Sequence, residues 1–345
     1  MASSSCKSAN MTVHYPMAHL LCQVANVTIH QPLISIVMPV YQVEKYIANS
    51  IRSVINQTFS SYEVILVNDG TRDRSIDIAI GILESAKIIY TLINQENSGL
   101  SAARNTGIRK SKGKWITCVD PDDVILPDFL ERLYGASLKY GADVAFCKFK
   151  VLDDMRIFSR STMRRGDCEV PQRKILLSYL KRRIVLITPA LLVRREFIER
   201  YDLWFDEKIK YSEDQHFIWR VLLAAKKVAI VRDKLYGYIK RPGSIMTSSN
   251  LNKVLTGYEG MKKLKNEIRG SKLLKKYILP RWVFAALNAS TRMMSYDEFT
   301  ELAKKMNYRS YLWQLLFFPD IRIPPLSMIM IINLKLFYQM GRSLK

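Results

Sequence analysis

Three carboxylates lie within four residues at Asp120-Pro121-Asp122-Asp123, directly after an apolar run that is expected to be a buried strand. Like charges this close repel one another, and burial adds a desolvation cost to each. A hard divalent cation removes the repulsion, because Mg²⁺ and Mn²⁺ bind carboxylate oxygens readily, usually together with substrate phosphates. The spacing therefore fits a metal–diphosphate site, although a solvated acidic turn has the same composition.

Two polar segments nearby have residue types suited to binding a nucleotide. Asp69, within Asn68-Asp69-Gly70, could accept hydrogen bonds from a ribose or a base, but this tripeptide also forms an ordinary turn. Asn97 or Ser98 is expected to cap a helix that carries Arg104 about one turn from its start. The Arg104 guanidinium could meet a phosphate or remain a surface charge.

A fourth acidic group, Glu213-Asp214, begins an amphipathic helix predicted from residue 215 to 225. Acidic residues are stabilised at a helix N-terminus by the helix dipole, which is a purely structural explanation. A general base that deprotonates a sugar hydroxyl must also be a carboxylate within hydrogen-bond reach. The spacing alone does not choose between these two roles.

The elements that would position these residues alternate between short apolar runs and amphipathic helices. The runs are predicted strands, at 33–39, 62–67, 87–93, 114–119 and 143–148, and helices are predicted at 44–57, 73–85, 100–110 and 127–140. This alternation predicts an α/β fold with a mainly parallel sheet, which binds ligands at the carboxyl ends of its strands. Asp69, Asp120 and the segment Pro39-Val40-Tyr41 each follow a predicted strand, so we expect them at one sheet edge.

The net charge of +22 indicates a polyanionic partner such as a phosphorylated molecule, nucleic acid or an anionic membrane. Residues 251–345 hold 17 Lys+Arg and 6 Asp+Glu, an excess of 11, within a pattern that is helical and rich in aromatic residues. These helices are expected either to lie on an anionic membrane surface or to cap the catalytic domain. Five widely spaced cysteines without a CxxC pair favour a reducing cytoplasm.

Five segments, in this order and at these intervals, together resemble glycosyltransferase family 2, which has the GT-A nucleotide-sugar-binding fold. The resemblance runs from about Leu33 to Arg220 and rests on LISIVMPVY at 33–41, VNDG at 67–70, NSGLSAARNTGI at 97–108, DPDD at 120–123 and SED at 212–214. One departure is Asn68, where many members have a first Asp. The resemblance implies a GT-A catalytic domain at 32–245, preceded by a poorly ordered leader at 1–31 and followed by a basic helical region at 246–345.

The resemblance also implies a role for each matching residue. The expected nucleotide-sugar-binding residues are Pro39, Val40, Tyr41, Glu44, Asp69, Asn97, Arg104, Asp120, Asp122 and Asp123. Asp122 is the expected ligand of Mn²⁺ or Mg²⁺, and the catalytic base is expected from Glu213 and Asp214, with Asp214 favoured.

The implied reaction is an inverting transfer of a hexosyl or N-acetylhexosaminyl group from a nucleotide donor, with UDP favoured, to a glycan or lipid-linked acceptor. The implied setting is surface polysaccharide synthesis (capsule, O-antigen or exopolysaccharide) in the cytoplasm or on the inner face of its membrane. This setting rests on analogy.

Three other functions compete with this interpretation. A nucleic-acid-binding protein would suit the charge, but the sequence has no nucleic-acid motif, and no nucleic-acid partner is expected. A nucleotidyltransferase usually has a Gly-rich phosphate loop near its first strand, whereas residues 39–45 contain no glycine. A catalytically inactive scaffold is disfavoured by the intact acidic residues.

Overall fold

The computed structural model describes residues 10–14, 31–153, 166–240, 250–320 and 322–343. The chain divides into two compact units. The first comprises Met1–Val170, Ile187–Phe205 and Ala225–Lys240, and the second comprises Pro171–Leu186, Asp206–Ala224 and Arg241–Lys345. The second unit therefore draws on residues 171–186 and 206–224 as well as on the C-terminal helices, whereas the sequence places its domain boundary at 245.

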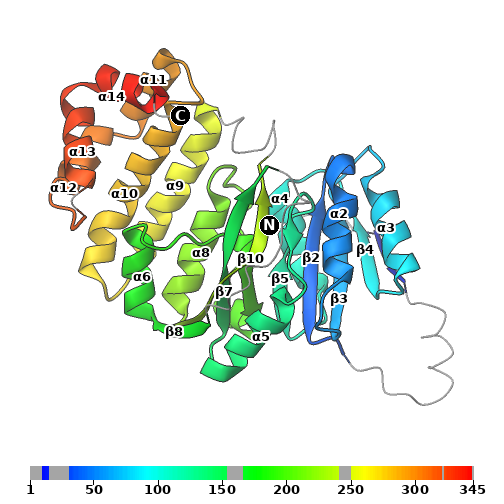
Figure 1. Cartoon of the computed structure of the whole chain (residues 1–345). Coiled ribbons are helices and arrows are strands. Elements are labelled where there is room, and N and C mark those ends of the chain that lie inside the picture. Colours follow the sequence, from blue (N-terminus) through cyan, green and yellow to red (C-terminus); the bar gives the residue numbers. More distant parts are fainter. Residues whose placement is uncertain (1–9, 15–30, 154–165, 241–249, 321, 344–345) are drawn as a thin grey trace, which may run out of the picture. The chain divides into compact units, whose positions relative to one another are not determined.

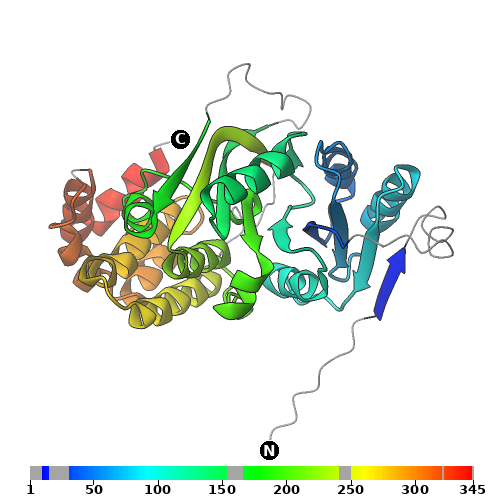
Figure 2. The ribbon, with the colours of Figure 1, turned by 90° about the horizontal axis from the view of Figure 1, so that it is seen from below.

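The first unit is built on one mixed sheet with helices on both faces (Figures 1 and 2). Within the described ranges its ten strands follow the order β1-β4-β3-β2-β5-β9-β7-β10-β6, and β8 pairs with β10. The strands are β1 Asn10–His14, β2 Ile34–Val40, β3 Tyr62–Asn68, β4 Tyr90–Asn94, β5 Trp115–Cys118, β6 Val124–Ile125, β7 Val144–Leu152, β8 Asp167–Pro171, β9 Leu191–Arg194 and β10 Lys227–Ile239.

The helices of this unit are α2 Glu44–Ile55, α3 Ser75–Ser85, α4 Leu100–Lys110, α5 Phe129–Tyr140 and α7 Arg195–Arg200, with a 3₁₀ turn at Thr188–Ala190. Helices α2 and α3 pack side by side on one face of the β2–β3–β4 strands, and α4 covers the other face (Figures 1 and 2). Alternate residues of a strand point to opposite faces. Accordingly, Ile36 and Met38 of β2 belong to the same core cluster as Ile47 of α2, whereas Val37 faces α4.

Strands β4, β3, β2 and β5 run parallel, so their carboxyl ends share one edge of the sheet. Val40 of β2 pairs with Asn68 of β3, which in turn pairs with Asn94 of β4, and Val37 pairs with Cys118 of β5. This register brings the ends of three predicted strands together as expected. Antiparallel pairs, such as β5 with β9 and β7 with β9, make the complete sheet mixed rather than purely parallel.

The second unit is helical in its described residues. Its helices are α6 Gln172–Leu180, α8 Glu213–Ala224, α9 Leu251–Glu267, α10 Lys272–Ser290, α11 Tyr296–Lys305, α12 Tyr308–Leu315, α13 Ile323–Ile332 and α14 Leu334–Ser343. The long helix α10 packs against α6, α9 and α12 and buries most of its length, including the internal Pro280. None of the helices in the described ranges combines the length and the apolar character that crossing a bilayer requires.

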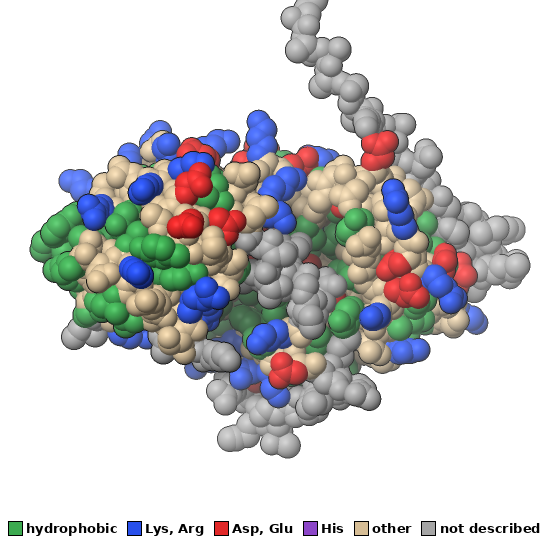
Figure 3. Space-filling view, turned by 90° about the horizontal axis from the view of Figure 1, so that it is seen from above, with side chains coloured by type: hydrophobic (Ala, Val, Ile, Leu, Met, Phe, Trp, Pro, Cys, Tyr) green, Lys and Arg blue, Asp and Glu red, His purple; other side chains and the backbone are tan. Residues whose placement is uncertain are grey.

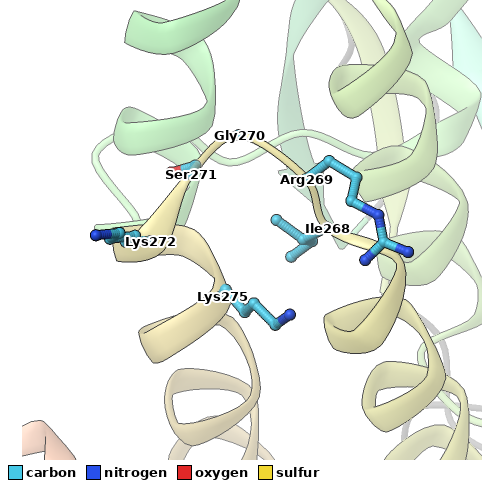
Figure 4. A pocket seen from close by; sticks show the side chains of 6 residues that line it. All are labelled: Ile268, Arg269, Gly270, Ser271, Lys272 and Lys275. Atoms are coloured by element: carbon cyan, nitrogen blue, oxygen red, sulfur yellow. The ribbon is translucent and has the colours of Figure 1, made fainter.

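The turn between α9 and α10 presents three basic side chains around a small pocket (Figure 4). Gly270 has a φ of +76°, a left-handed conformation that favours glycine, and it allows the chain to reverse there. Ser271 then caps α10, because its Oγ accepts a hydrogen bond from the Leu274 amide at 3.3 Å. Arg269, Lys272 and Lys275 line the pocket and add to the basic excess of this unit.

The predicted elements match the structure closely in the first unit. The helix at 100–110 has the predicted bounds, and other elements differ from their predicted ends by a few residues. Five residues of the expected leader form β1, which pairs with the edge strand β4, while residues 1–9 and 15–30 lie outside the described part of the chain.

Gly107 sets how closely α4 approaches the sheet. A Cβ at this position would lie 2.3 Å from Val37 Cγ1 and 3.1 Å from Val67 Cγ2. We predict that Gly107→Ala lowers the free energy of unfolding by about 1–3 kcal/mol, because the added methyl overpacks the helix–sheet contact. Chemical denaturation monitored by circular dichroism measures the change.

Gly81 of α3 is the matched control, since a Cβ there meets nothing within 4 Å. Gly81→Ala should stabilise by roughly 0.5–1 kcal/mol through the lower entropy of its unfolded chain. Equal effects of the two substitutions would contradict the close approach of α4.

Candidate functional site

The loops that follow β2 and β3 are joined by hydrogen bonds at the carboxyl edge of the sheet. The backbone amides of Gln42, Val43 and Glu44 donate to Thr71 Oγ1, Ser75 Oγ and Asp73 Oδ2 at 2.8, 3.0 and 3.1 Å. In return, the Arg74 amide donates to Glu44 Oε2 at 3.2 Å. These bonds fix the loop that carries the exposed Tyr41, so two predicted binding residues, Tyr41 and Glu44, are held next to the end of β3.

Asp73, at the centre of this arrangement, is absent from the predicted site. Its Oδ1 accepts hydrogen bonds from the Thr71 hydroxyl at 2.8 Å and the Ser75 hydroxyl at 2.6 Å. Burial acts to raise the pKa of Asp73, but hydrogen bonds from Ser75, Thr71 and the Glu44 amide outweigh it and lower the pKa. The signal available in the sequence was a carboxylate with hydroxyl residues two positions to either side.

Asp69 is buried, and its carboxylate accepts hydrogen bonds from the loop that leads into α4. Oδ1 accepts hydrogen bonds from the Ser98 amide at 2.9 Å and from Gln95 Nε2 at 2.8 Å, and Oδ2 accepts one from the Gly99 amide at 2.9 Å. A carboxylate at this place satisfies amides that a helix leaves unpaired, and the helix dipole favours its charge. Asp69 therefore joins the end of β3 to α4, and its contact with a nucleotide stays a prediction.

The predicted cap by Asn97 or Ser98 is wrong. Gly99 occupies the N-cap position with a φ of +88° and no side-chain cap bond, and the Ser98 hydroxyl donates instead to the Glu96 carbonyl at 2.9 Å. The two loops approach closely here, since a Cβ on Gly70 would lie only 3.0 Å from the Asn97 nitrogen. The Asn97 side chain is exposed near this edge.

Arg104 and Asp120, predicted separately, form an ion pair. Arg104 Nη2 lies 2.7 Å from Asp120 Oδ1, with 3% of the Arg104 side chain and 21% of the Asp120 side chain exposed. The Arg104 guanidinium also lies over the ring of Phe205, 5.3 Å from its centroid. A charge-assisted hydrogen bond of this length orients the Asp120 carboxylate and offsets much of the cost of burying Arg104.

Asp123 points into the protein. Its carboxylate accepts hydrogen bonds from the Tyr236 hydroxyl at 2.6 Å and from the Ile239 amide at 2.7 Å, both on β10. Desolvation, together with the charges of Asp120 and Asp122, raises its pKa well above the usual value. Tyr236 also accepts a hydrogen bond from the Asp120 amide at 3.3 Å, so β10 holds both ends of the acidic turn.

Asp122 is half-buried between these two anchored residues. Within the described residues, no group of three or more His, Cys, Asp or Glu side chains could hold a metal ion by itself. The oxygen ligands present fit Mg²⁺ or Mn²⁺ shared with a diphosphate, since such ions are commonly held by one or two carboxylates plus substrate phosphates. The side chains of Pro39 and Val40 are buried in β2, which leaves their backbone as the part suited to contact a ligand.

Glu213 and Asp214 begin α8, which belongs to the second unit. The Gln215 amide donates to Asp214 Oδ1 at 2.7 Å, in the arrangement expected of an acidic residue at a helix N-terminus. Burial, together with the nearby Asp214 charge, raises the pKa of Tyr211 to about 12. Asp214 therefore lies in a partly apolar environment that contains Tyr179 and Tyr211.

The family comparison agrees with the arrangement of the first unit. Residues 35–202 match the sequence profile of the family described as Glycosyl transferase family 2. The protein named "Uncharacterized glycosyltransferase EpsJ", of Bacillus subtilis (strain 168), is 36% identical over 216 residues, which cover 61% of this chain and 62% of that protein. The chain thus spans under two thirds of the length of this relative.

Two solved structures share the fold. TarS 1–349 of S. aureus, in complex with UDP-GlcNAc, superposes with a TM-score of 0.65 at 20% identity and covers 90% of each chain. The mannosyltransferase PcManGT from Pyrobaculum calidifontis, in complex with GDP-Man and Mn²⁺, has a TM-score of 0.54 at 14% identity and covers 93% of this chain and 95% of that one. These likenesses confirm the predicted GT-A fold and helical C-terminal region.

The ion pair between Arg104 and Asp120 makes a quantitative prediction. Arg104→Met and Asp120→Leu should each lower the free energy of unfolding by about 2–3 kcal/mol, less than for a fully buried pair because Asp120 is partly exposed. The double variant should lose at least about 1 kcal/mol less than the sum, because the two residues interact directly. Urea denaturation of the four proteins completes the cycle.

Arg109, on the same helix, provides the control, since its guanidinium lies over the ring of Trp204, 4.9 Å from the centroid. A cycle of Arg109→Met with Asp120→Leu should be additive. Additive losses in the Arg104 cycle as well would show that the 2.7 Å pair contributes no coupling.

Proposed function

We propose that this chain, whose residues 35–202 belong to glycosyl transferase family 2, is an inverting glycosyltransferase that moves a sugar from a nucleotide donor to a hydroxyl group. The observation that carries the proposal is the carboxyl edge of β2, β3 and β5. There, the hydrogen-bonded loops after β2 and β3 adjoin the Arg104–Asp120 pair and Asp122.

The donor is proposed to be a UDP-sugar that carries a hexosyl or N-acetylhexosaminyl group. TarS, a structural relative, binds UDP-GlcNAc, whereas the more distant PcManGT binds GDP-Man. In this proposal the backbone of Pro39 and Val40, the exposed Tyr41 and the Asp69 region contact the nucleoside. Arg104 keeps Asp120 oriented toward the ribose and diphosphate.

Asp122 is the proposed ligand of a Mn²⁺ or Mg²⁺ ion shared with the donor diphosphate, as the hard oxygen donors of this edge favour. Such an ion supplies Lewis-acid stabilisation of the leaving nucleoside diphosphate. Asp123 keeps the acidic turn in place through Tyr236 and Ile239.

Asp214 is the proposed general base, with Glu213 beside it. In the transfer step, the acceptor oxygen forms a bond to the anomeric carbon while its proton passes to the Asp214 carboxylate. The bond between that carbon and the diphosphate oxygen breaks, and the nucleoside diphosphate leaves with the electron pair. Attack from the face opposite the leaving group inverts the anomeric centre.

The acceptor is proposed to be a glycan or lipid-linked saccharide in surface polysaccharide synthesis, on the cytoplasmic side of the membrane. Among similar curated proteins, the poly(ribitol-phosphate) beta-N-acetylglucosaminyltransferase TarS of Staphylococcus aureus is 26% identical over 219 residues, or 62% of this chain and 37% of that protein. Its name describes an acceptor that is an anionic polymer. The excess of basic residues in the present chain suits an acceptor that is likewise anionic.

Exposed apolar side chains on the C-terminal helices support peripheral attachment to an anionic membrane. Three packed helices and the segment between them carry Trp313, Phe317, Met328, Ile332 and Leu336, of which Phe317 and Ile332 are about three quarters exposed, at 75% and 74%. Figure 3 shows apolar side chains gathered with Lys and Arg over this unit. Aromatic and aliphatic residues flanked by cations are typical of proteins that lie on a membrane surface.

A donor panel tests the reaction. With Mn²⁺ and a set of nucleotide sugars, wild-type protein should release nucleoside diphosphate from one donor, and Asp122→Ala should abolish this metal-dependent release. Asp214→Asn should lower turnover by about 10²–10⁴-fold and leave donor affinity unchanged, because it removes only the base. Asp77→Ala, an exposed acid on α3, is the control and should retain full activity.

Unchanged turnover in Asp214→Asn would show that another group is the base. Salt-dependent binding of random DNA without any donor release would instead favour a nucleic-acid-binding protein, and donor binding without release in the presence of acceptor extracts would favour an inactive scaffold.

A sedimentation assay tests the membrane proposal. Wild-type protein should pellet with vesicles of 30% phosphatidylglycerol at low salt. The double variant Phe317→Ser/Ile332→Ser should lose roughly tenfold or more in affinity, because it removes two apolar side chains that would be buried in the membrane. Leu138→Ser, at an exposed apolar position of α5 in the first unit, is the matched control. Absence of wild-type binding, or an equal loss in the control, would refute the assignment of this surface.

A further inference from the structure

Arg281 of α10 carries a guanidinium whose hydrogen bonds are incomplete. Among the described residues, its Nε and Nη1 atoms are buried and have no hydrogen-bond partner. The guanidinium lies over the ring of Phe284, 5.6 Å from the centroid, which provides contact with a π face but accepts no conventional hydrogen bond. Buried donors without an acceptor are rare in native proteins, and a charged one is especially costly, so this group calls for an anionic partner.

The position of Arg281 on α10 identifies its neighbours. Tyr277 lies one turn earlier and therefore on the same face of the helix. Its hydroxyl donates to the Phe317 carbonyl at 3.0 Å, so this face is turned toward the segment that leads to Arg322. The adjacent Trp282 makes an edge contact with Tyr211, with ring centroids 6.2 Å apart.

The charges around Arg281 do not balance. Burial, together with the positive charges of Arg182 and Arg322, lowers its pKa to about 10, and the Asp320 carboxylate opposes this effect. Asp320 is already engaged, because Arg322 Nε and Nη2 donate to its Oδ1 and Oδ2 at 3.1 and 3.0 Å. Because Arg322 occupies the Asp320 carboxylate, the positive charges of Arg281 and Arg182 are in excess.

Arg182 occupies a backbone position that normally favours glycine. It follows the end of α6 with a φ of +51°, its amide donates to the Tyr179 carbonyl at 3.0 Å, and the Arg183 amide donates to the Ser178 carbonyl at 2.9 Å. This bonding closes a helix with a left-handed residue, where a side chain causes strain. An arginine at this position places a charge near Arg281 at the expense of backbone preference.

Arg182 also lies near the proposed base. The charges of both Arg182 and Asp214 act on the hydroxyls of Tyr179 and Tyr211, so the four side chains share one region of the second unit. The guanidinium pair therefore belongs to the same region as the carboxylate that would deprotonate the acceptor.

We propose that Arg281 and Arg182 form a binding site for a phosphate group, and that this group belongs to the acceptor. The unpartnered Nε and Nη1 donors of Arg281, together with the nearby Arg182 guanidinium, match a phosphate group in charge and in hydrogen-bonding chemistry. The phosphate site stands on the geometry of the second unit alone, whereas its assignment to the acceptor rests on the proposed glycosyl transfer. A phosphate of a lipid headgroup has the same chemistry and is the other source to be distinguished.

Thermal unfolding in sodium phosphate, compared with sodium chloride at equal ionic strength, tests the site. At ten times its dissociation constant, phosphate should raise the Tm of wild-type protein by about 2–4 °C. The rise should fall to less than half of this in Arg281→Gln and in Arg182→Gly. Without phosphate, Arg182→Gly should itself raise the Tm, because glycine relieves the left-handed backbone.

Two control variants separate the site from general charge effects. Arg269→Gln removes an exposed arginine of the α9–α10 turn (Figure 4) and should keep the full phosphate response. Asp122→Ala, at the proposed donor site, should also keep it, so a failure of the proposed enzymatic function leaves this test intact. Equal responses in wild type, Arg281→Gln and Arg182→Gly would overturn the proposal. If Arg281→Gln fails to fold, the Arg182→Gly response decides.

Vesicle binding distinguishes the two phosphate sources. If Arg281→Gln loses the phosphate response but still pellets with phosphatidylglycerol vesicles like wild type, the result supports a site for the acceptor phosphate. Parallel loss of the phosphate response and of vesicle binding assigns the site to a lipid headgroup and overturns the acceptor assignment.

Discussion

The candidate donor site depends on helix α4 being held at both ends of its first two turns. Asp69 accepts hydrogen bonds from the amides of Ser98 and Gly99 before the helix begins, and Arg104 reaches Asp120 one turn later at 2.7 Å. Gly107 lets the same helix approach the sheet closely. Because α4 thereby connects the end of β3 to the acidic turn after β5, a shift of this helix would move both at once.

Two arginines illustrate how differently this chain treats a buried guanidinium. Arg104 has a carboxylate partner and an aromatic ring, and its burial organises an acidic turn. Arg281 also lies over an aromatic ring, but its neighbours Arg182 and Arg322 add positive charge. A guanidinium paired with a carboxylate stabilises its surroundings, whereas one surrounded by excess positive charge is stabilised when an anionic ligand binds. The contrast explains why we assign a structural role to one and a binding role to the other.

The distribution of charge follows the same division. Acidic residues are concentrated at the carboxyl edge of the sheet, where a bound cation, shared with a diphosphate, would balance their negative charge. Basic residues are in excess in the C-terminal helices, since residues 251–345 contain 17 Lys+Arg and only 6 Asp+Glu. Exposed Phe317 and Ile332 add apolar surface to that basic unit. An enzyme that joins a nucleotide-bound sugar to an anionic, membrane-presented acceptor would require both kinds of surface.

Local pattern in the sequence was sufficient for the elements of the first unit and for the edge at which its polar residues meet. Periods of two and 3.6 residues depend on near neighbours, so helix 100–110 was predicted with its observed bounds, and the strand ends placed Asp69 and Asp120 together. The partners of those residues were decided by the tertiary structure. Asp123 bonds to Tyr236, 113 positions away, and Asp69 binds the amides of Ser98 and Gly99, of which Gly99 is the N-cap residue of α4. The unmatched positive charge around Arg281 depends on Arg182, which follows α6, and on Arg322, which precedes α13. Such contacts join segments that are remote along the chain, and their distances are set by packing, which no local pattern encodes.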